Sequence, residues 1–191
     1  YFYRIKAGVW SDVKRMTLMG TSASSATVRT YLGAHPNLRL PDGGPIFDGF
    51  LLTSTLGNSP MPIVDVPIVQ MPTQTEVATY AQQGIAYRRP DSDAPGNRFR
   101  LYEVAGMPHN NSRDNPGFLN DPCTLPVTDF PAGAFTALGL NHLIEWIANG
   151  KTPPHAPPIA VDQDASNDGS PLALDEHGNA KGGIRNVWVD V

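Results

Sequence analysis

The chain has 191 residues, of which 40% are hydrophobic and 17% are charged, and its formal net charge is −4 at pH 7. This length suits one domain with a buried core, or part of a larger one, and the composition excludes a disordered chain. The acidic balance argues against nucleic-acid binding, and no stretch is long and apolar enough to predict a membrane span. The single cysteine, Cys123, excludes an internal disulfide and lies in a loop without metal-ligand spacing.

Apolar runs alternate with helical patterns along most of the chain. The sequence predicts strands over 15–20, 46–55, 66–71 and 98–106, and helices over 23–33, 75–83 and 132–150. In the last helix the expected apolar stripe consists of Leu140, Leu143, Ile144 and Ile147, and Gly150 is expected to cap the end. This order predicts an α/β fold with a parallel sheet, in which functional residues lie at the carboxyl ends of strands.

The first such strand end carries the segment "GTSAS", residues 20–24. A serine on a tight strand-to-helix turn is exposed for nucleophilic attack, but the turn requires small residues two positions before and after it. Gly20 and Ser24 meet this requirement around Ser22. An ordinary helix N-cap is the alternative for Ser22. A second Gly-x-Ser, around Ser59, is rejected because Pro60 has no N–H to offer an oxyanion.

A nucleophilic serine needs a histidine base, and the base needs a carboxylate that orients it. Glu76 follows the predicted strand 66–71, and His109 follows the predicted strand 98–106. The chain order serine, acid, histidine is the order expected where a nucleophilic serine lies on such a strand-to-helix turn of a parallel sheet. We therefore expect Ser22, Glu76 and His109 to act together, with the backbone N–H of Ala23 donating to the oxyanion.

Other residues compete for the acid and base positions. Asp65 precedes its strand and so lies at the wrong end of the sheet, whereas Asp91 and Asp93 lie in a turn-like loop where solvated or turn-forming carboxylates are expected. The remaining histidines are weaker candidates. His35 lies next to Pro36 after the first predicted helix, His142 lies within the last predicted helix, and His155 and His177 lie in polar tails, where exposed side chains are expected.

The ordered set of these segments resembles the catalytic part of the α/β-hydrolase superfamily, and specifically a bacterial family known as "alpha/beta hydrolase domain" proteins. The shared segments are "GTSASSATVRTYL", "FDGFL", "VPIVQMPTQTEV", "RFRLYEVAGMPH", "LNHLIEWIANGKTPPHAPP" and "DEHGNAKGGIRNVWVDV". The resemblance implies a serine hydrolase that cleaves a carboxylic ester without metal or cofactor. In it Ser22 would be the nucleophile, Glu76 the acid and His109 the base. Ser24 replaces the commoner glycine, and Glu76 stands where aspartate is usual.

In such families the segment before the serine supplies several strands and a second oxyanion-hole donor, whereas about 20 residues precede Ser22 here. We therefore expect residues 1–191 to be the C-terminal part of one α/β-hydrolase domain, poorly soluble and nearly inactive alone. Within it, residues 12–150 would carry the site, and residues 151–191 would form a tail packed on the domain. The loop 107–131, with Phe118 and Phe130, could line a substrate pocket, although core packing is the alternative for these rings.

Two other functions are compatible with the sequence. The first is a catalytically inactive hydrolase relative that acts as a binding domain, which a large separation of Ser22 from His109 would indicate. The second is a structural calcium site in residues 162–176, where Asp164, Ser166, Asp168 and Asp175 have a spacing similar to that of an EF-hand loop. Pro171 and the non-helical flanking segments argue against an EF-hand. The sequence does not indicate a compartment or an oligomeric state.

Overall fold

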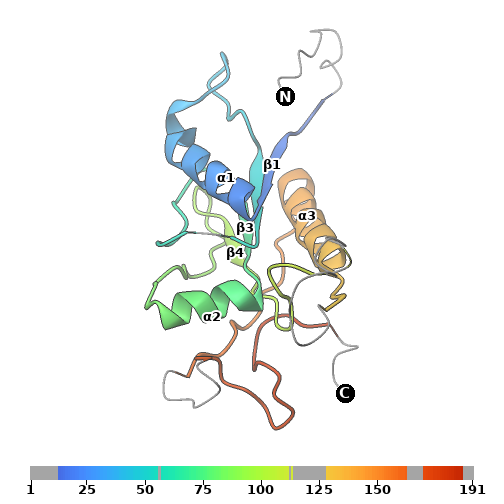
Figure 1. Cartoon of the computed structure of the whole chain (residues 1–191). Coiled ribbons are helices and arrows are strands. Elements are labelled where there is room, and N and C mark those ends of the chain that lie inside the picture. Colours follow the sequence, from blue (N-terminus) through green and yellow to red (C-terminus); the bar gives the residue numbers. More distant parts are fainter. Residues whose placement is uncertain (1–12, 56, 112, 114–127, 163–169, 187–191) are drawn as a thin grey trace.

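Four parallel strands form one sheet in the order β1-β2-β3-β4 (Figure 1). They are β1 (Thr17–Thr21), β2 (Gly49–Thr53), β3 (Ile68–Met71) and β4 (Phe99–Leu101). The computed structural model describes residues 13–55, 57–111, 113, 128–162 and 170–186 of the chain. The α/β fold with a parallel sheet that the sequence predicts is confirmed.

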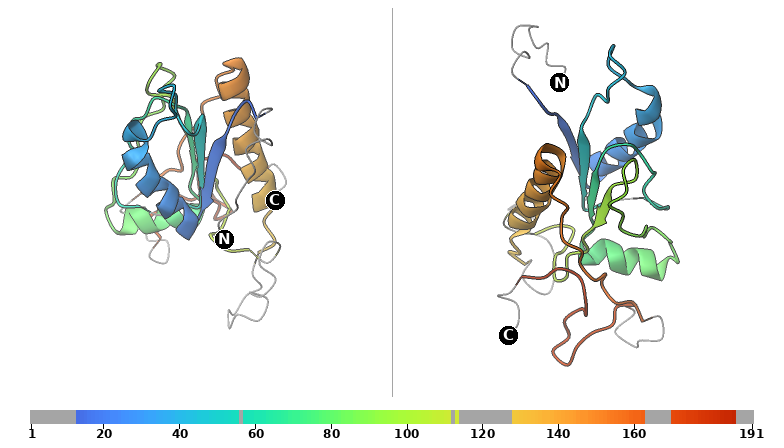
Figure 2. Two further views of the ribbon diagram at one scale, coloured as in Figure 1. Left: turned by 90° about the horizontal axis from the view of Figure 1, so that it is seen from above. Right: turned by 180° about the vertical axis from the view of Figure 1, so that it is seen from behind.

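Helices cover both faces of this sheet (Figure 2). Helices α1 (Ala23–Ala34) and α2 (Gln74–Gln82) lie on one side and α3 (Ala132–Asn149) lies on the other. A short 3₁₀ turn, η2 (His35–Asn37), follows α1 directly. Within the described ranges, no helix is long and apolar enough to cross a membrane.

The central strand β2 is buried on both faces, which explains its continuous apolar run. Phe50 and Leu52 pack with Val28 of α1, whereas Leu51 faces the opposite cluster together with Leu143 of α3. Side chains of neighbouring strand residues point to opposite faces, so one short strand contributes to both clusters.

The face that α3 turns to the sheet includes three of the four residues of the predicted stripe. Leu143 is buried, and Leu140 and Ile147 pack partly buried against the same core cluster, whereas Ile144 is 44% exposed. Gly139 and Trp146 are buried on this face as well, and a Cβ on Gly139 would lie 2.2 Å from the Met71 sulfur. The helix therefore turns its glycine toward Met71 and packs closely on the strands. Gly150 ends α3 in the left-handed conformation, as predicted.

All four strands are shorter than predicted, β2 and β4 by the most. β2 covers only 49–53 of the predicted 46–55, and β4 covers only 99–101 of the predicted 98–106. Beyond Leu101 the chain still pairs locally, since the Val104 N–H donates to the Pro72 carbonyl at 3.1 Å. Pro72 has no N–H with which to return a bond, so regular pairing stops.

The segment after α3 is held against the end of β4 by a buried carboxylate. Glu103 accepts hydrogen bonds from Nε and Nη2 of Arg88 at 2.7 and 2.8 Å and from the Ile159 backbone N–H at 2.6 Å. The Glu103 carbonyl also accepts from the N–H of Ile184 at 2.8 Å. A buried charge needs this degree of pairing to be tolerated, and here the pairing joins chain segments that are far apart in sequence.

Candidate active site

Ser22 lies on a sharp turn between β1 and α1. Its backbone has φ 53° and ψ −123°, a conformation that residues with a side chain rarely adopt. Ser22 occupies the N-cap position of α1, but its hydroxyl makes no capping bond to that helix. The Ser25 N–H is instead bonded to the Ser22 carbonyl at 2.9 Å, which leaves the Ser22 hydroxyl available for another partner.

Two residues that flank Ser22 make this turn possible. A Cβ on Gly20 would lie 2.6 Å from the Ser24 carbonyl oxygen and 2.8 Å from the Ser25 Cα, so only glycine fits. Ser24 does more than occupy little space. Its hydroxyl accepts from the Thr21 N–H at 2.8 Å and donates to the Thr21 carbonyl at 2.7 Å. The sequence predicted that residue 24 must be small but not that its hydroxyl forms two hydrogen bonds with the Thr21 backbone.

The partner of the Ser22 hydroxyl is His109, from the loop that follows β4. Ser22 Oγ lies 2.7 Å from His109 Nε2, and His109 Nδ1 lies 2.5 Å from Glu76 Oε1. An ionised carboxylate only accepts hydrogen bonds, so Nδ1 carries the proton that is donated to Glu76. In the neutral ring Nε2 is then the acceptor for the Ser22 hydroxyl.

Glu76 is fixed in the first turn of α2, where the helix dipole favours negative charge. It is 3% exposed, and its second oxygen, Oε2, accepts from the Thr73 N–H at 2.7 Å. Both carboxylate oxygens are thus engaged, one by the helix start and one by His109. The His109 side chain is 25% exposed, so the ring joins a buried carboxylate to an accessible hydroxyl.

The start of α2 also holds the loop that carries His109. The Gln74 N–H donates to the Met107 carbonyl at 3.0 Å, and Gln74 Oε1 accepts from the Gly106 N–H at 2.7 Å. Thr75 Oγ1 accepts from the His109 N–H at 3.2 Å. Consecutive residues of one helix start therefore position both the carboxylate and the histidine loop. Sequence reasoning missed Gln74 and Thr75, although both lie next to the predicted acid.

The competing carboxylates have other partners. Asp65 binds His35 at 2.9 Å and Arg39 at 3.0 Å. Asp91 and Asp93 bind the buried Arg100 at 3.1 and 2.6 Å. One expectation is thereby corrected, because the two loop aspartates pair with a buried guanidinium rather than with solvent alone. The His155 ring is largely exposed, as expected, and lies 2.9 Å from Asp91.

The other histidines are placed away from Ser22. His142 packs on the Tyr102 ring, with 5.9 Å between ring centroids. Burial lowers the pKa of His142, and the charges of Lys151 and Arg100 lower it further. His177 is exposed and lies 3.5 Å from Glu176.

Several other predicted features do not join the site. The Ser59 hydroxyl accepts from Arg29 at 2.7 Å, which accounts for the second Gly-x-Ser. Phe130 is buried and packs on Phe135 with 5.2 Å between ring centroids, so core packing holds for this ring. Phe118, Cys123 and most of the calcium-like loop lie outside the described residues. In the described part of the chain, no three metal-ligating side chains of His, Cys, Asp or Glu gather as they would around a metal ion.

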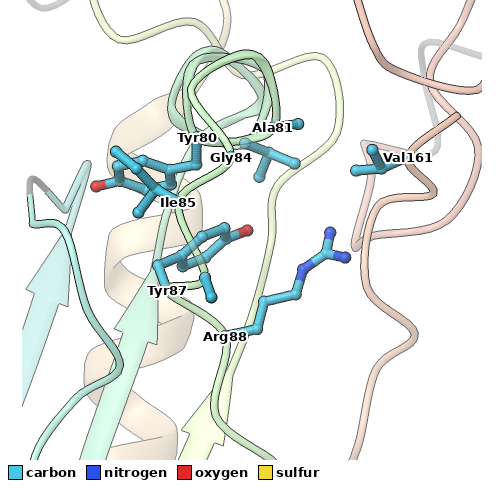
Figure 3. A pocket seen from close by; sticks show the side chains of 9 residues that line it. Tyr80, Ala81, Gly84, Ile85, Tyr87, Arg88 and Val161 are labelled. Carbon is cyan, nitrogen blue, oxygen red and sulfur yellow. The ribbon is translucent and has the colours of Figure 1, made fainter. Parts of the chain in front are cut away.

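A pocket of about 360 Å³ lies beside the last turns of α2 (Figure 3). The rings of Tyr80 and Tyr87, the Arg88 side chain and Val161 line it. None of Ser22, Glu76 and His109 is part of its lining. The pocket is therefore not the site at which Ser22 would react.

The comparisons with known proteins agree with this architecture. A sequence model of the family described as "Alpha/beta hydrolase domain" matches residues 8–191. No curated protein and no solved structure matches the chain. Since the match extends over nearly the whole sequence, the chain belongs to the alpha/beta hydrolase domain family.

Proposed function

We propose that the protein is a serine hydrolase that cleaves a carboxylic ester through an acyl-enzyme. Family membership supports hydrolase-type activity. The observation that carries the finer proposal is the hydrogen-bonded chain from Ser22 through His109 to Glu76, with 2.7 Å between Ser22 Oγ and His109 Nε2. A base must lie within hydrogen-bond reach of the proton that it removes, and this distance satisfies that condition.

In the first half of the reaction, His109 Nε2 removes the proton from Ser22 Oγ as this oxygen attacks the ester carbonyl carbon. Glu76 holds the ring through Nδ1 and stabilises the imidazolium that forms. The oxyanion of the tetrahedral intermediate would accept from the N–H of Ala23, the first residue of α1, where the positive end of the helix dipole favours the charge.

The intermediate then collapses with cleavage of the bond between the carbonyl carbon and the alkoxy oxygen. The imidazolium gives its proton to the departing alkoxide, which leaves as the alcohol, and the acyl group remains on Ser22 Oγ. In the second half His109 removes a proton from water, which attacks the acyl-enzyme, and then returns this proton to Ser22 as the acid leaves. No net proton remains on the protein after one turnover.

The alternative of an inactive binding domain accounts less well for this geometry. A binding domain has no need for a serine in a strained conformation whose hydroxyl is aligned with a histidine. Nor does it need a carboxylate that is buried and bonded to the same ring. Strained residues with reactive side chains are typical of catalytic sites, and this favours the esterase proposal.

The test, on the full-length protein, is labelling by a fluorophosphonate probe together with hydrolysis of p-nitrophenyl esters. We expect the probe to modify Ser22 and the Ser22→Ala variant to be neither labelled nor active, with a fall in kcat of at least about 10⁴-fold because the nucleophile is missing. Thr30→Ala, which removes an exposed hydroxyl of α1, serves as the control with unchanged activity. Folded wild-type protein that is not labelled at Ser22 would contradict the proposal.

A further inference from the structure

A second serine lies in a rare backbone conformation at the same edge of the sheet. β2 ends at Thr53, and the next residue, Ser54, has φ 45°. Over the described ranges, Ser22 and Ser54 are the two residues other than glycine with a positive φ. Such conformations are disfavoured by the side chain and cluster where proteins bind or transform ligands. Their occurrence at adjacent strand ends therefore calls for a common explanation.

The sheet register places Ser54 beside the proposed nucleophile. Thr21 of β1 pairs with Thr53 of β2, so Ser22 and Ser54 each follow a residue of the same pair. The Ser22 N–H donates to the Thr53 carbonyl at 3.2 Å, and the Ser54 N–H donates to the Met71 carbonyl at 2.9 Å. Ser22 and Ser54 thus leave the sheet at the same position along their neighbouring strands.

The order of the strands places Ser54 between the strand ends that carry the site residues Ser22 and Glu76. β2 lies between β1, which leads to Ser22, and β3, which leads to Glu76, while His109 comes from beyond β4. The hydrogen bonds of His109 thus join Ser22 and Glu76, which follow the strands on either side of β2. Ser54 therefore follows the strand between the proposed nucleophile and its acid.

The backbone around Ser54 is held firmly by its neighbours. The Tyr80 hydroxyl donates to the Thr55 carbonyl, and Thr55 Oγ1 donates to the Leu52 carbonyl at 3.2 Å. Burial, together with the charge of Glu76, raises the pKa of Tyr80 to about 12, so its hydroxyl stays a protonated donor at neutral pH. These bonds maintain the strained turn without using the Ser54 hydroxyl.

The Ser54 side chain itself has no role in that turn. Its hydroxyl forms no hydrogen bond with any residue that the structure describes, and the residue is 3% exposed. Glycine would adopt the same backbone conformation without strain. A serine here therefore needs a reason beyond the turn, and the adjacent nucleophile suggests one.

We propose that Ser54 is a substrate-binding residue of the Ser22 site, whose hydroxyl hydrogen-bonds an oxygen of the bound carboxylic ester. This inference rests on the proposed esterase function. A hydroxyl can donate to the carbonyl oxygen of an ester or to its alkoxy oxygen, and both oxygens lie next to the carbon that Ser22 attacks. The strain at Ser54 is then the means of holding that hydroxyl at the end of β2.

Two variants separate the hydroxyl from the strain. Ser54→Ala removes the hydroxyl and keeps the strained backbone, whereas Ser54→Gly removes both. We expect kcat/KM for a p-nitrophenyl ester to fall about three- to tenfold in each variant, mainly through KM, as for loss of one neutral hydrogen bond. The rate at which a small sulfonyl fluoride inactivates Ser22 should stay within about twofold of wild type, because Ser54 does not move the Ser22 proton. Ser54→Gly should also raise the melting temperature by about 2–4 °C.

Either of two results would overturn this inference while leaving the esterase proposal intact. Ester kcat/KM within about twofold of wild type in both variants would make Ser54 a turn residue only. An equal fall in the ester and sulfonyl fluoride rates would mean that Ser54 shapes the nucleophile turn without binding substrate. Wild-type protein that neither hydrolyses esters nor reacts with the sulfonyl fluoride would instead overturn the esterase proposal, and this inference with it.

Discussion

Two histidine–carboxylate pairs lie at the opposite ends of helix α1. Ser22 precedes the helix and bonds to His109, which bonds to Glu76. His35 follows the helix and bonds to Asp65 at 2.9 Å. Both are an imidazole beside a carboxylate, yet they differ in which partner is buried.

At the Ser22 end the carboxylate is buried and the imidazole is accessible, whereas at the other end the arrangement is reversed. Glu76 is 3% exposed, but the Asp65 side chain is 50% exposed and His35 is fully buried. His35 packs edge-on to Phe50 with 5.2 Å between ring centroids, and its Nδ1 has no hydrogen-bond partner among the described residues. Only the first pair can take part in the proposed catalysis, because only there does the second ring nitrogen reach a hydroxyl. The His35 pair instead fixes the chain that leaves α1.

Replacing the two histidines should give opposite results, and this is the largest expected effect. His109→Gln should lower kcat/KM for an ester by at least about 10⁴-fold with little change in stability, because it removes the proposed base. His35→Gln should keep the activity but lower the free energy of unfolding by about 1–3 kcal/mol, because it disturbs a buried hydrogen bond and its aromatic packing. Ester kinetics and urea denaturation measure the two effects. Activity lost in His35→Gln at unchanged stability would contradict the comparison.

Substitution of two glycines tests the Ser22 turn and the helix that follows it separately. Gly20→Ala places a Cβ 2.6 Å from the Ser24 carbonyl oxygen, whereas a Cβ on Gly33 meets nothing within 4 Å. We expect Gly20→Ala to destabilise the protein by about 1–3 kcal/mol through overlap and to lower the activity. Gly33→Ala should stabilise it by up to about 1 kcal/mol, since alanine is the better helix former. Thermal unfolding tests both, and an equal response of the two variants would show that the turn is not tightly constrained.

The smallest expected effect concerns acid stability at the His35 end. Burial raises the pKa of Asp65, but hydrogen bonds from His35 and Arg39 outweigh it and hold the pKa below the ordinary 3.8. Because the folded pKa is depressed, this stabilisation is present above the unfolded pKa and is lost as pH falls through the folded value. Asp65→Asn should therefore flatten the decline of stability below about pH 4 and leave ester hydrolysis unchanged. Urea unfolding at a series of acid pH values tests this, and identical pH profiles of variant and wild type would contradict it.

The sequence predicted most of the order of the fold because that order depends on local patterns. Apolar runs such as "GFLLT" and "IVQM" form strands, and α2 begins as predicted next to a threonine and a first-turn glutamate. The departures depend on contacts between segments that are distant in sequence. The shortening of β4 follows from Pro72 on the neighbouring chain segment, and the burial of Gly139 rather than Ile144 on α3 is visible only against Met71.

The sequence by itself determined that Ser22 stands between small residues at the end of a strand, and that Glu76 and His109 follow later strands. It could do so because the size requirement of a turn and the apolar pattern of a strand are each contained in a few consecutive residues. Only the tertiary structure decided that His109 meets Ser22 across 87 residues of chain, while His35 turns to Asp65. It alone revealed the strained Ser54 next to Ser22. The physical reason is that parallel pairing brings distant strand ends to one edge, where side-chain contacts depend on packing that no local pattern records.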